Sequence, residues 1–354
     1  MIPILVGGGL SFFFVILSSY LGVNLFQSRN IGQNIQDELD FHKHKKGTPT
    51  MGGIFIILGT YIGYLFSHIN FWTIGKGFLI EITQIDKNIL YLLLLATLMS
   101  LVGLLDDILS VSRKRNLGLS VVSKFSLQLI VASLIVFWLH SIDLGTEFSL
   151  FSGIGFDIGY FKYLVLVLII IFITNSVNIT DGLDGLVAGS SSMSLAGILI
   201  ISFWIYRHPS YYLNHVNPEF VNLDLPILIA ATAGSTLGFL WWNTNPAKII
   251  MGDVGSHFIG CLLPLLLIVL QSEGLILLIC FIYIVESVSV IAQVFSFKYR
   301  KKRIFKMAPL HHHFEMKNWA ETTVIVRFWI ISTIFVIIAV GLFYLDWVLY
   351  GGQL

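Results

Sequence analysis

The sequence predicts an all-α integral membrane protein with about ten transmembrane helices. Three observations support this fold class: an apolar composition, ten apolar runs of membrane-spanning length, and a one-sided distribution of basic residues. Of the 354 residues, 56% are hydrophobic and 12% are charged, and the mean hydropathy is +0.85. Soluble domains carry roughly 25% charged residues, so most of this surface must face lipid. No linker or repeat divides the chain, and residues 1–354 are predicted to form a single polytopic membrane domain.

The apolar runs predict the transmembrane helices in order. A helix needs about 20 apolar residues to cross roughly 30 Å of hydrocarbon. The first run, 3–26, lacks a preceding basic segment and is too long for the apolar part of a signal peptide, so we expect a membrane span there. The other nine runs are 50–67, 88–105, 121–140, 161–177, 185–205, 226–242, 255–271, 274–296 and 325–349.

Two connections between these runs have features of their own. The short polar stretch between residues 177 and 185 fits either a loop between two helices or a break inside one long helix. The glycine-containing stretch 145–160 is compatible with a short hairpin.

Basic residues predict the orientation of the chain in the membrane. Four of the 21 Lys and Arg residues, namely Lys76, Lys87, Lys162 and Arg207, fall on one side of the predicted spans, and the other 17 fall on the opposite side. Cytoplasmic loops carry the excess of Lys and Arg, so the larger set is expected inside. With ten spans, both termini then lie outside.

Five carboxylates lie at the ends of spans on the predicted cytoplasmic side: Asp106, Asp107, Asp181, Asp184 and Asp253. A charged side chain at a helix end reaches water while its neighbours stay in lipid. Because three separate loops contribute these acids, they can converge in space. We therefore predict an active site on the cytoplasmic face.

Asp106 and Asp107 follow the 88–105 run and precede the basic stretch Arg113–Arg115. A solvated helix end beside a basic loop is the simpler interpretation. However, acids at a helix C-terminus oppose the macrodipole, which favours cations there. This position favours a counter-ion such as Mg²⁺, or a role in proton transfer.

Polar residues recur at every third position from the end of the 161–177 run into the stretch that follows it. They are Asn175, Asn178, Asp181 and Asp184. Steps of three drift around an ideal α-helix, so a 3₁₀ turn or a break at the glycines of this stretch is needed to align them. A polar linker is the alternative interpretation. Amides and acids together suit a cation and a nucleotide.

Asp253 lies between two glycines, just before the 255–271 run. It is interpreted either as the N-cap of that helix or as a metal ligand, and the two roles are compatible. The flanking glycines allow a ligand to approach the backbone closely, and a helix N-terminus attracts phosphate.

Two further segments suit phosphate contact. The stretch 45–53 is basic, turn-forming and hydroxyl-bearing, and it leads into the second span. His311, His312 and His313 follow the basic run 298–306. Consecutive side chains cannot all point one way, which argues against a three-histidine metal site, but imidazoles can donate hydrogen bonds to a diphosphate. The basic run itself is typical of a lipid-headgroup patch.

Together these segments resemble the phospho-N-acetylmuramoyl-pentapeptide-transferase (MraY) family, within the polyprenyl-phosphate N-acetylhexosamine-1-phosphate transferase superfamily. The resemblance covers nearly the whole chain. The paired acids and the Asn178–Leu186 segment occur across the superfamily, whereas the triple histidine and Val326–Ile331 are specific to the family. The matching segments are Lys46–Gly53, Asp106–Asp107, Asn178–Leu186, Phe239–Asn243, Met251–Ser256 and Ala308–Glu315.

The resemblance implies a ten-helix homodimer with outward termini and a Mg²⁺-dependent site on the cytoplasmic face of the bacterial inner membrane. It implies transfer of phospho-MurNAc-pentapeptide from UDP-MurNAc-pentapeptide to undecaprenyl phosphate. The products would be lipid I and UMP, in the first membrane step of peptidoglycan synthesis. No nucleic-acid partner is expected.

The resemblance also implies roles for individual residues. Asp253, with Asn178, would hold Mg²⁺, while Asp106, supported by Asp107, would deprotonate or orient the lipid phosphate. Asp106, Asp107 and Asp253 are therefore the predicted catalytic residues. The predicted substrate contacts are Lys45, Thr50, Lys124, Asn175, Asn178, Asp181, Asp184, His311, His312 and His313. Direct attack by the lipid phosphate and a phospho-enzyme route both fit these residues.

Two positions depart from the family pattern. Ile250 stands where many members have Phe, and Ser110 where many have Lys. The family's contacts with nucleoside inhibitors are therefore not carried over to these positions.

Two other classes of membrane protein are weighed against this interpretation. A relative that uses UDP-GlcNAc would share the acids but not the triple histidine. A secondary transporter usually has its site near the midplane, on broken helices of repeated halves. Here only Glu286 lies in the middle of a predicted span, and it is interpreted as a buried structural acid, with Gln293 as the suggested partner.

Overall fold

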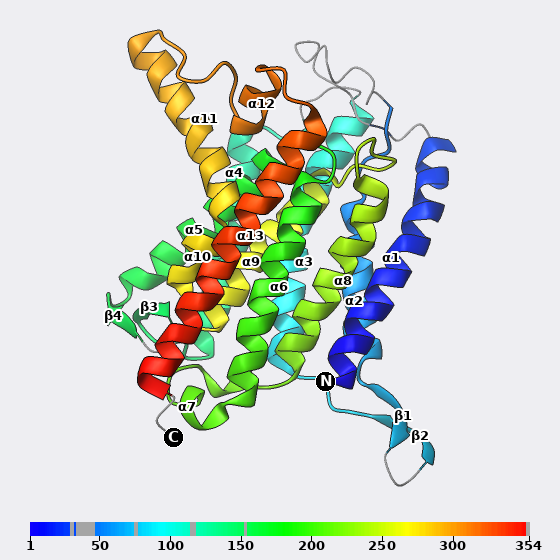
Figure 1. Cartoon of the computed structure of the whole chain (residues 1–354), viewed down its shortest axis with the longest axis vertical. Helices are drawn as coiled ribbons and strands as arrows, with labels where there is room; N and C mark the ends of the chain where they lie inside the picture. The colour runs from blue at the N-terminus through cyan, green and yellow to red at the C-terminus, as the bar shows by residue number, and fades with distance from the viewer. Residues whose placement is uncertain (29–31, 33–46, 74–76, 114–117, 152–153, 352–354) are drawn as a thin grey trace.

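A computed structural model describes residues 1–28, 32, 47–73, 77–113, 118–151 and 154–351. Within these residues, nine helices are long and apolar enough to cross a membrane, and Figure 1 shows them as a bundle. They coincide with nine of the ten predicted runs. The nine are α1 (Ile2–Ser28), α3 (Lys87–Ser112), α4 (Val121–Ser141), α5 (Phe161–Thr180), α6 (Leu186–Arg207), α8 (Asp224–Asn243), α9 (Gly252–Val269), α11 (Phe281–Arg300) and α13 (Glu321–Asp346). The chain thus has the fold of a multi-pass helical membrane protein.

The remaining predicted run, 50–67, forms a shorter helix than predicted. Helix α2 (Gly53–Phe66) has 14 residues, about 21 Å at 1.5 Å per residue. The residues just before it form backbone hydrogen bonds with the loop that precedes α9: Ile250 N donates to Pro49 O at 2.7 Å, and Gly52 N donates to Ile250 O at 2.9 Å. Residues 50–52 therefore lie outside the helix, because the backbone of this segment is hydrogen-bonded to Ile250 in the loop before α9.

Helices α5 and α6 are separate, because a turn at residues 181–185 ends one and begins the other. Gly185 in this turn has a φ of +81°, a backbone conformation that favours glycine. The predicted 274–296 span is interrupted near its start, where η3 (Glu273–Leu275) and α10 (Ile276–Ile279) precede α11. The remaining short helices are α7 (Pro209–Tyr212), η2 (Pro218–Phe220), α12 (Leu310–Glu315) and η4 (Trp347–Gly351).

Two antiparallel hairpins connect helices at one end of the bundle (Figure 1). Strands β3 (Glu147–Phe151) and β4 (Ile154–Asp157) confirm the hairpin predicted in 145–160. Strands β1 (Ile69–Thr73) and β2 (Gly77–Ile82) form a second hairpin in the connection between the 50–67 and 88–105 runs. Both chain termini lie at this same end, while α12 lies at the other (Figure 1). Termini at one end agree with an even number of crossings.

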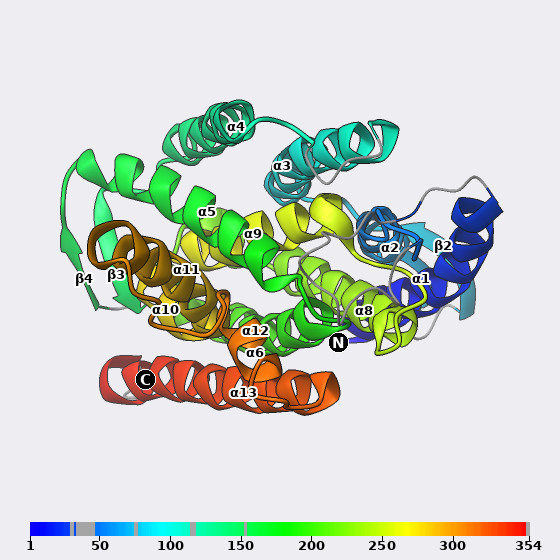
Figure 2. The same ribbon diagram turned by 90° about the horizontal axis from the view of Figure 1, so that it is seen from above.

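Helix α9 is the central element of the bundle. Every residue from Val254 to Val269 is buried, and α2, α3, α5 and α6 contact it (Figure 2). Small residues allow these close approaches: a Cβ added at Gly53 would lie 2.2 Å from Gly255 Cα, and one at Gly260 would lie 2.7 Å from Thr174 Cα. Because the backbones touch, the N-terminus of α9 is held in place on several sides.

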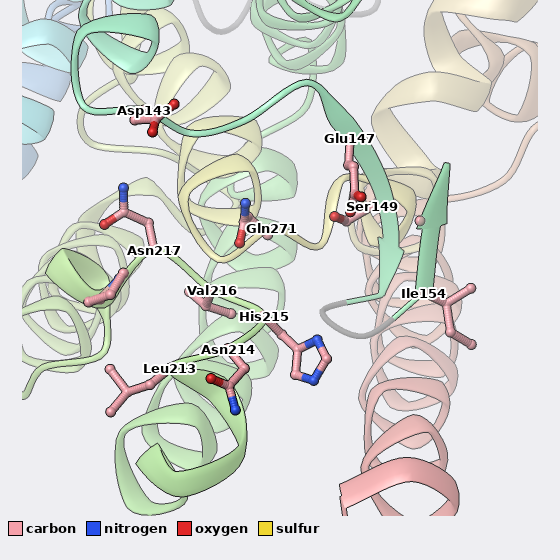
Figure 3. A pocket seen from close by; sticks show the side chains of 12 residues that line it. Asp143, Glu147, Ser149, Ile154, Leu213, Asn214, His215, Val216, Asn217 and Gln271 are labelled. Carbon is pink, nitrogen blue, oxygen red and sulfur yellow. The ribbon is translucent and has the colours of Figure 1, made fainter. Parts of the chain in front are cut away.

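A buried ion pair ties the β3–β4 hairpin to the bundle. Lys162 Nζ lies 2.9 Å from Glu273 Oε1, and both side chains are fully buried. Lys162 also donates to Glu147 O at 2.5 Å, and Glu273 Oε2 accepts from Ser149 N at 3.1 Å. An open polar pocket of about 420 Å³ lies beside this hairpin, next to Asn214 and His215 (Figure 3). It is at the same end as the termini.

We expect Lys162→Met to destabilise the protein strongly, because it leaves the Glu273 carboxylate buried without its cation. Breaking a buried pair in this way costs about 3–5 kcal/mol. Thermal unfolding in detergent measures the effect. The double variant Lys162→Met/Glu273→Leu should be more stable than the single one, and equal melting temperatures for wild type and Lys162→Met would contradict a role for the pair.

Candidate active site

The N-terminus of α9 is capped by a side chain from another helix. Asp107, near the end of α3, accepts hydrogen bonds from Asp253 N at 3.1 Å and Val254 N at 3.0 Å. The first N–H groups of a helix have no partner within the helix. The positive end of the helix macrodipole lies there and favours an anion. Asp253 itself makes no side-chain cap, so the N-cap interpretation of this residue is wrong. It lies in the first turn instead.

This arrangement explains why two acids occur at the C-terminal end of α3. The pair is unfavourable for its own helix, but Asp107 is compensated by the positive end of α9. Gly252, with a φ of +74°, makes the contact possible, because a Cβ there would lie 2.7 Å from Asp107 Oδ2. Asp107 thus holds the backbone on which Asp253 stands.

Lys124, in the first turn of α4, lies between two carboxylates. Its ammonium is paired with Asp253 Oδ2 and lies 3.7 Å from Asp106 Oδ2. Asp106 also accepts a hydrogen bond from Leu119 N at 2.7 Å. The side chains of Lys124, Asp106 and Asp253 are 18%, 18% and 24% exposed. They are therefore fixed by the protein and still open to a ligand.

Asn178, on α5, completes the set around Asp253. Its Nδ2 donates to Asp253 Oδ1 at 2.7 Å and to Ser256 Oγ at 3.0 Å. One oxygen of the Asp253 carboxylate thus faces an amide and the other an ammonium. Of the acids predicted to converge, those at the ends of α3 and α9 lie together, joined by the amide of Asn178 from α5.

Asp184 is placed differently, in the turn between α5 and α6. It is buried, and its Oδ2 accepts a hydrogen bond from Ala247 N at 2.9 Å. Its own N–H donates to Glu321 Oε1 at 3.1 Å. Asp184 therefore ties this turn to the 244–250 loop, which leads into α9. Asp181 is half-buried at the end of α5, where its N–H donates to Asn178 O at 3.2 Å.

The three histidines lie on the short helix α12, and a mid-span acid caps that helix. Glu286 is fully buried, and it accepts hydrogen bonds from Leu310 N at 2.7 Å and His311 N at 3.1 Å. The His311 ring also lies 3.2 Å from this carboxylate. Glu286 is thus a structural acid, as predicted. Gln293 is not its partner: it bonds the backbone of Phe305 instead.

The histidine side chains have different neighbours, as expected for consecutive residues. His311 packs on the 181–185 turn, since a Cβ added at Gly182 would lie 2.5 Å from its Nε2. His312 Nδ1 lies 2.7 Å from Glu315 Oε2. His313 Nδ1 accepts a hydrogen bond from Lys306 N at 3.0 Å, so its Nε2 carries the proton. Desolvation and the nearby ammonium groups of Lys317 and Lys306 lower the pKa of His313.

Thr50 and Asn175, two of the remaining predicted contacts, lie beside the site. Thr50 is buried next to the α9 N-terminus, where a Cβ added at Gly252 would lie 3.1 Å from its Oγ1. Lys45 lies outside the described residues. Asn175 lies one turn before Asn178, and its side chain is hydrogen-bonded to Gln128.

Gln128 and His257 were missed in the sequence because each lies inside an apolar run. Both are buried near Asp253. Each follows a predicted site residue by four positions, Lys124 and Asp253 respectively, and therefore shares its helix face. That spacing was the available signal.

We expect Gly103→Ala to lower activity at least tenfold. Gly103 lies where α3 crosses α9, and an added Cβ would lie 2.2 Å from the carbonyl oxygen of Asp253. A shift of about 1 Å in a catalytic group can cost roughly 100-fold in rate. Turnover is the measurement, and Gly341→Ala is the matched control, because a Cβ there meets no atom within 4 Å. Equal turnover for the two variants would contradict this packing argument.

Comparison with known proteins assigns this fold and site to a class. The family model of glycosyl transferase family 4 matches residues 89–271, which span α3 to α9 and include every acid of the site. The chain is therefore a membrane-embedded glycosyl transferase of this class. A phospho-N-acetylmuramoyl-pentapeptide-transferase signature matches residues 45–57, which include Pro49 and Gly52, the residues paired with the loop before α9.

Full-length relatives narrow the class. Phospho-N-acetylmuramoyl-pentapeptide-transferase of Frankia casuarinae is 39% identical over 350 residues, covering 93% of this chain and 94% of its own length. The enzymes of the same name from Corynebacterium efficiens and Kocuria rhizophila are 37% and 38% identical, and the alignments cover 97% and 99% of this chain and 98% and 97% of theirs. The chain belongs to the phospho-N-acetylmuramoyl-pentapeptide-transferase family.

Proposed function

We propose that this protein transfers phospho-MurNAc-pentapeptide from UDP-MurNAc-pentapeptide to undecaprenyl phosphate, producing lipid I and UMP. The observation that carries the proposal is the cluster of Lys124, Asp106, Asp253 and Asn178 at one end of a membrane bundle. It has the charged groups that a phosphoryl transfer needs. The names of its relatives supply the identity of the donor.

Charge is the main obstacle to this reaction, since both substrates are anions. Among the described residues, no three His, Cys, Asp or Glu side chains form a metal-binding group. Mg²⁺ in such enzymes is usually held by one or two carboxylates together with substrate phosphates and water. Asp253 and Asn178 fit this small set, so we propose that they hold Mg²⁺. When bound, the ion neutralises charge on the diphosphate.

The residues of the chain have separate roles in this proposal. Lys124 offers its ammonium to a phosphate oxygen, and Asp106 orients the lipid phosphate and accepts its proton. An oxygen of that phosphate attacks the sugar-linked phosphorus of the donor, and the bond from this phosphorus to the bridging oxygen breaks, so UMP leaves. Asp181, Asp184, Thr50, Lys45 and the α12 histidines are proposed to contact the nucleotide, sugar or leaving group. We favour direct attack; isolation of a labelled phospho-enzyme would contradict it.

An apolar groove next to the site suits the polyprenyl chain. A groove of about 580 Å³ lies between α4 and α5, and Phe125, Leu168, Phe172 and Asn175 are among the residues that line it. It opens on the outside of the bundle, where lipid is expected. A lipid phosphate can then reach Asp106 and Lys124 while its tail stays in the membrane.

The proposal includes an orientation and an assembly. The site would face the cytoplasm, where the UDP-linked donor is made, with both termini outside. The 17-to-4 distribution of Lys and Arg residues supports this. The membrane is the bacterial inner membrane, and the enzyme is proposed to act as a homodimer.

The test is UMP release by the purified protein. We expect release that requires UDP-MurNAc-pentapeptide, undecaprenyl phosphate and Mg²⁺, and that stops when EDTA removes the ion. Preference for UDP-GlcNAc in a donor competition would favour the related GlcNAc-1-phosphate transferases. Substrate uptake into proteoliposomes without UMP release would favour a transporter.

A further inference from the structure

A second polar layer lies directly beneath the site, one helical turn deeper in the bundle. Three helices each contribute one residue to the site and a second residue, three or four positions away, to this layer. The layer consists of Gln128 of α4, Asn175 of α5 and His257 of α9, which accompany Lys124, Asn178 and Asp253 respectively. Gln128 and His257 are 1% and 0% exposed.

The hydrogen bonds of this layer define the state of His257. Its Nδ1 lies 2.8 Å from the carbonyl oxygen of Asp253, which can only accept, so Nδ1 carries the proton. Its Nε2 lies 3.0 Å from Gln128 Nε2. A neutral ring has one bare nitrogen, so Nε2 accepts from the amide of Gln128. The ring is thus fixed at both ends.

Gln128 and Asn175 lock each other. Asn175 Nδ2 donates to Gln128 Oε1 at 2.8 Å, and Gln128 Nε2 donates to Asn175 Oδ1 at 3.2 Å. Asn175 Nδ2 also donates to Ile171 O at 2.8 Å. Both amides are therefore fixed in one orientation, with their N–H groups used inside the protein. Asn175 is thereby better suited to hold Gln128 than to contact a substrate.

Asp253 is held on both sides of its backbone. Its N–H is bound by Asp107, and its carbonyl oxygen accepts from His257 Nδ1 at 2.8 Å and from Ser256 Oγ at 3.2 Å. Its side chain therefore projects from a fixed point toward Lys124 and Asn178. Groups that orient a functional carboxylate from behind commonly change activity or affinity 10- to 100-fold when removed.

A buried polar layer is costly in an apolar bundle unless every member is hydrogen-bonded, and hydrophobic residues of similar size often pack as well. Here the layer lies under the site residues of the three helices that form it, and its three members are hydrogen-bonded to one another or to the backbone. We propose that His257, through Gln128 and Asn175, is a positioning residue that fixes Asp253 for phosphoryl transfer. This inference rests on the proposed function.

The first test is His257→Leu, which keeps a similar volume but removes the ring N–H that donates to Asp253 O and the acceptor for one N–H of Gln128. We expect kcat to fall about 10- to 100-fold, while KM for the UDP-linked donor stays within about twofold. A change confined to kcat indicates loss of an interaction that matters in the transition state. Cys261→Ala, one turn further along α9 and also fully buried, is the control and should keep normal kcat.

Two conservative variants separate the two bonds of the ring. An asparagine at 257 can place its amide N–H where Nδ1 was and still donate to Asp253. A glutamine at 257 reaches toward Gln128 but does not replace that donor in the same position. We therefore expect His257→Asn to recover more of the lost kcat than His257→Gln. If His257→Leu does not fold, Gln128→Met tests the same layer and should also lower kcat.

Normal kcat in both His257→Leu and Gln128→Met would overturn the inference, as would a loss that appears only in KM. Failure of His257→Asn to exceed His257→Leu would also overturn it. The proposed function is judged separately: it fails if wild type releases no UMP. An active wild type, an inactive Asp253→Asn and a fully active His257→Leu would refute only the positioning role.

Discussion

Asp253→Asn is expected to lower kcat by roughly 10²- to 10³-fold, comparable to removal of one preorganised electrostatic group from an active site. The carboxylate faces Lys124 and Asn178 at the same time. Asparagine keeps the shape but loses the charge, so it neither balances the ammonium nor binds a divalent cation as well. An amide N–H can also meet the Asn178 amide and disturb its orientation.

Steady-state UMP release measures this effect, and thermal unfolding shows whether the fold is kept. Asp157→Asn is the matched control, because Asp157 is an exposed acid on β4 at the opposite end of the molecule. It should leave kcat unchanged. A fully active Asp253→Asn would remove Asp253 from the mechanism.

Asp106→Asn should lower kcat by about 10²- to 10⁴-fold, the range for a residue that transfers a proton in the rate-limiting step. The substitution is expected to leave the structure intact, because the asparagine carbonyl can still accept the hydrogen bond from Leu119 N. What it loses is the ability to take a proton and the ion pair with Lys124.

Comparison with Asp107→Asn makes this prediction specific. Asp107 uses both oxygens to accept backbone N–H groups of α9, and asparagine has one acceptor oxygen. Asp107→Asn should therefore lower the melting temperature as well as kcat, whereas Asp106→Asn should lower kcat alone. The same loss of stability in both variants, or normal turnover in Asp106→Asn, would contradict the division of roles.

Most of the fold could be predicted from composition and apolar runs, because lipid requires continuous helices with paired backbone groups. The departures come from contacts distant in the chain. Residues 50–52 are apolar enough for a span, but their backbone pairs with the loop before α9, so α2 starts late. The β1–β2 hairpin, in the connection between the 50–67 and 88–105 runs, was not predicted.

The sequence could predict which residues belong to the site better than it could predict how they are arranged. Acids and amides at span ends indicate a functional site, because charged side chains are costly inside the membrane and are seldom kept near it without a role. Which acid caps a helix and which faces a ligand depends on partners such as the N–H groups of Asp253 and Val254, 146 and 147 residues from Asp107. His257 looked like part of an apolar span, although its position four residues after Asp253 places it on the same face.

The most direct test of the central claim is a double-mutant cycle between Lys124 and Asp253, with kcat for UMP release as the measurement. If the ammonium and carboxylate act as one unit on the phosphates, Lys124→Met/Asp253→Asn should be no slower than the slower single variant. If the two losses instead multiply in the double variant, the residues act independently and the account of a shared site is wrong.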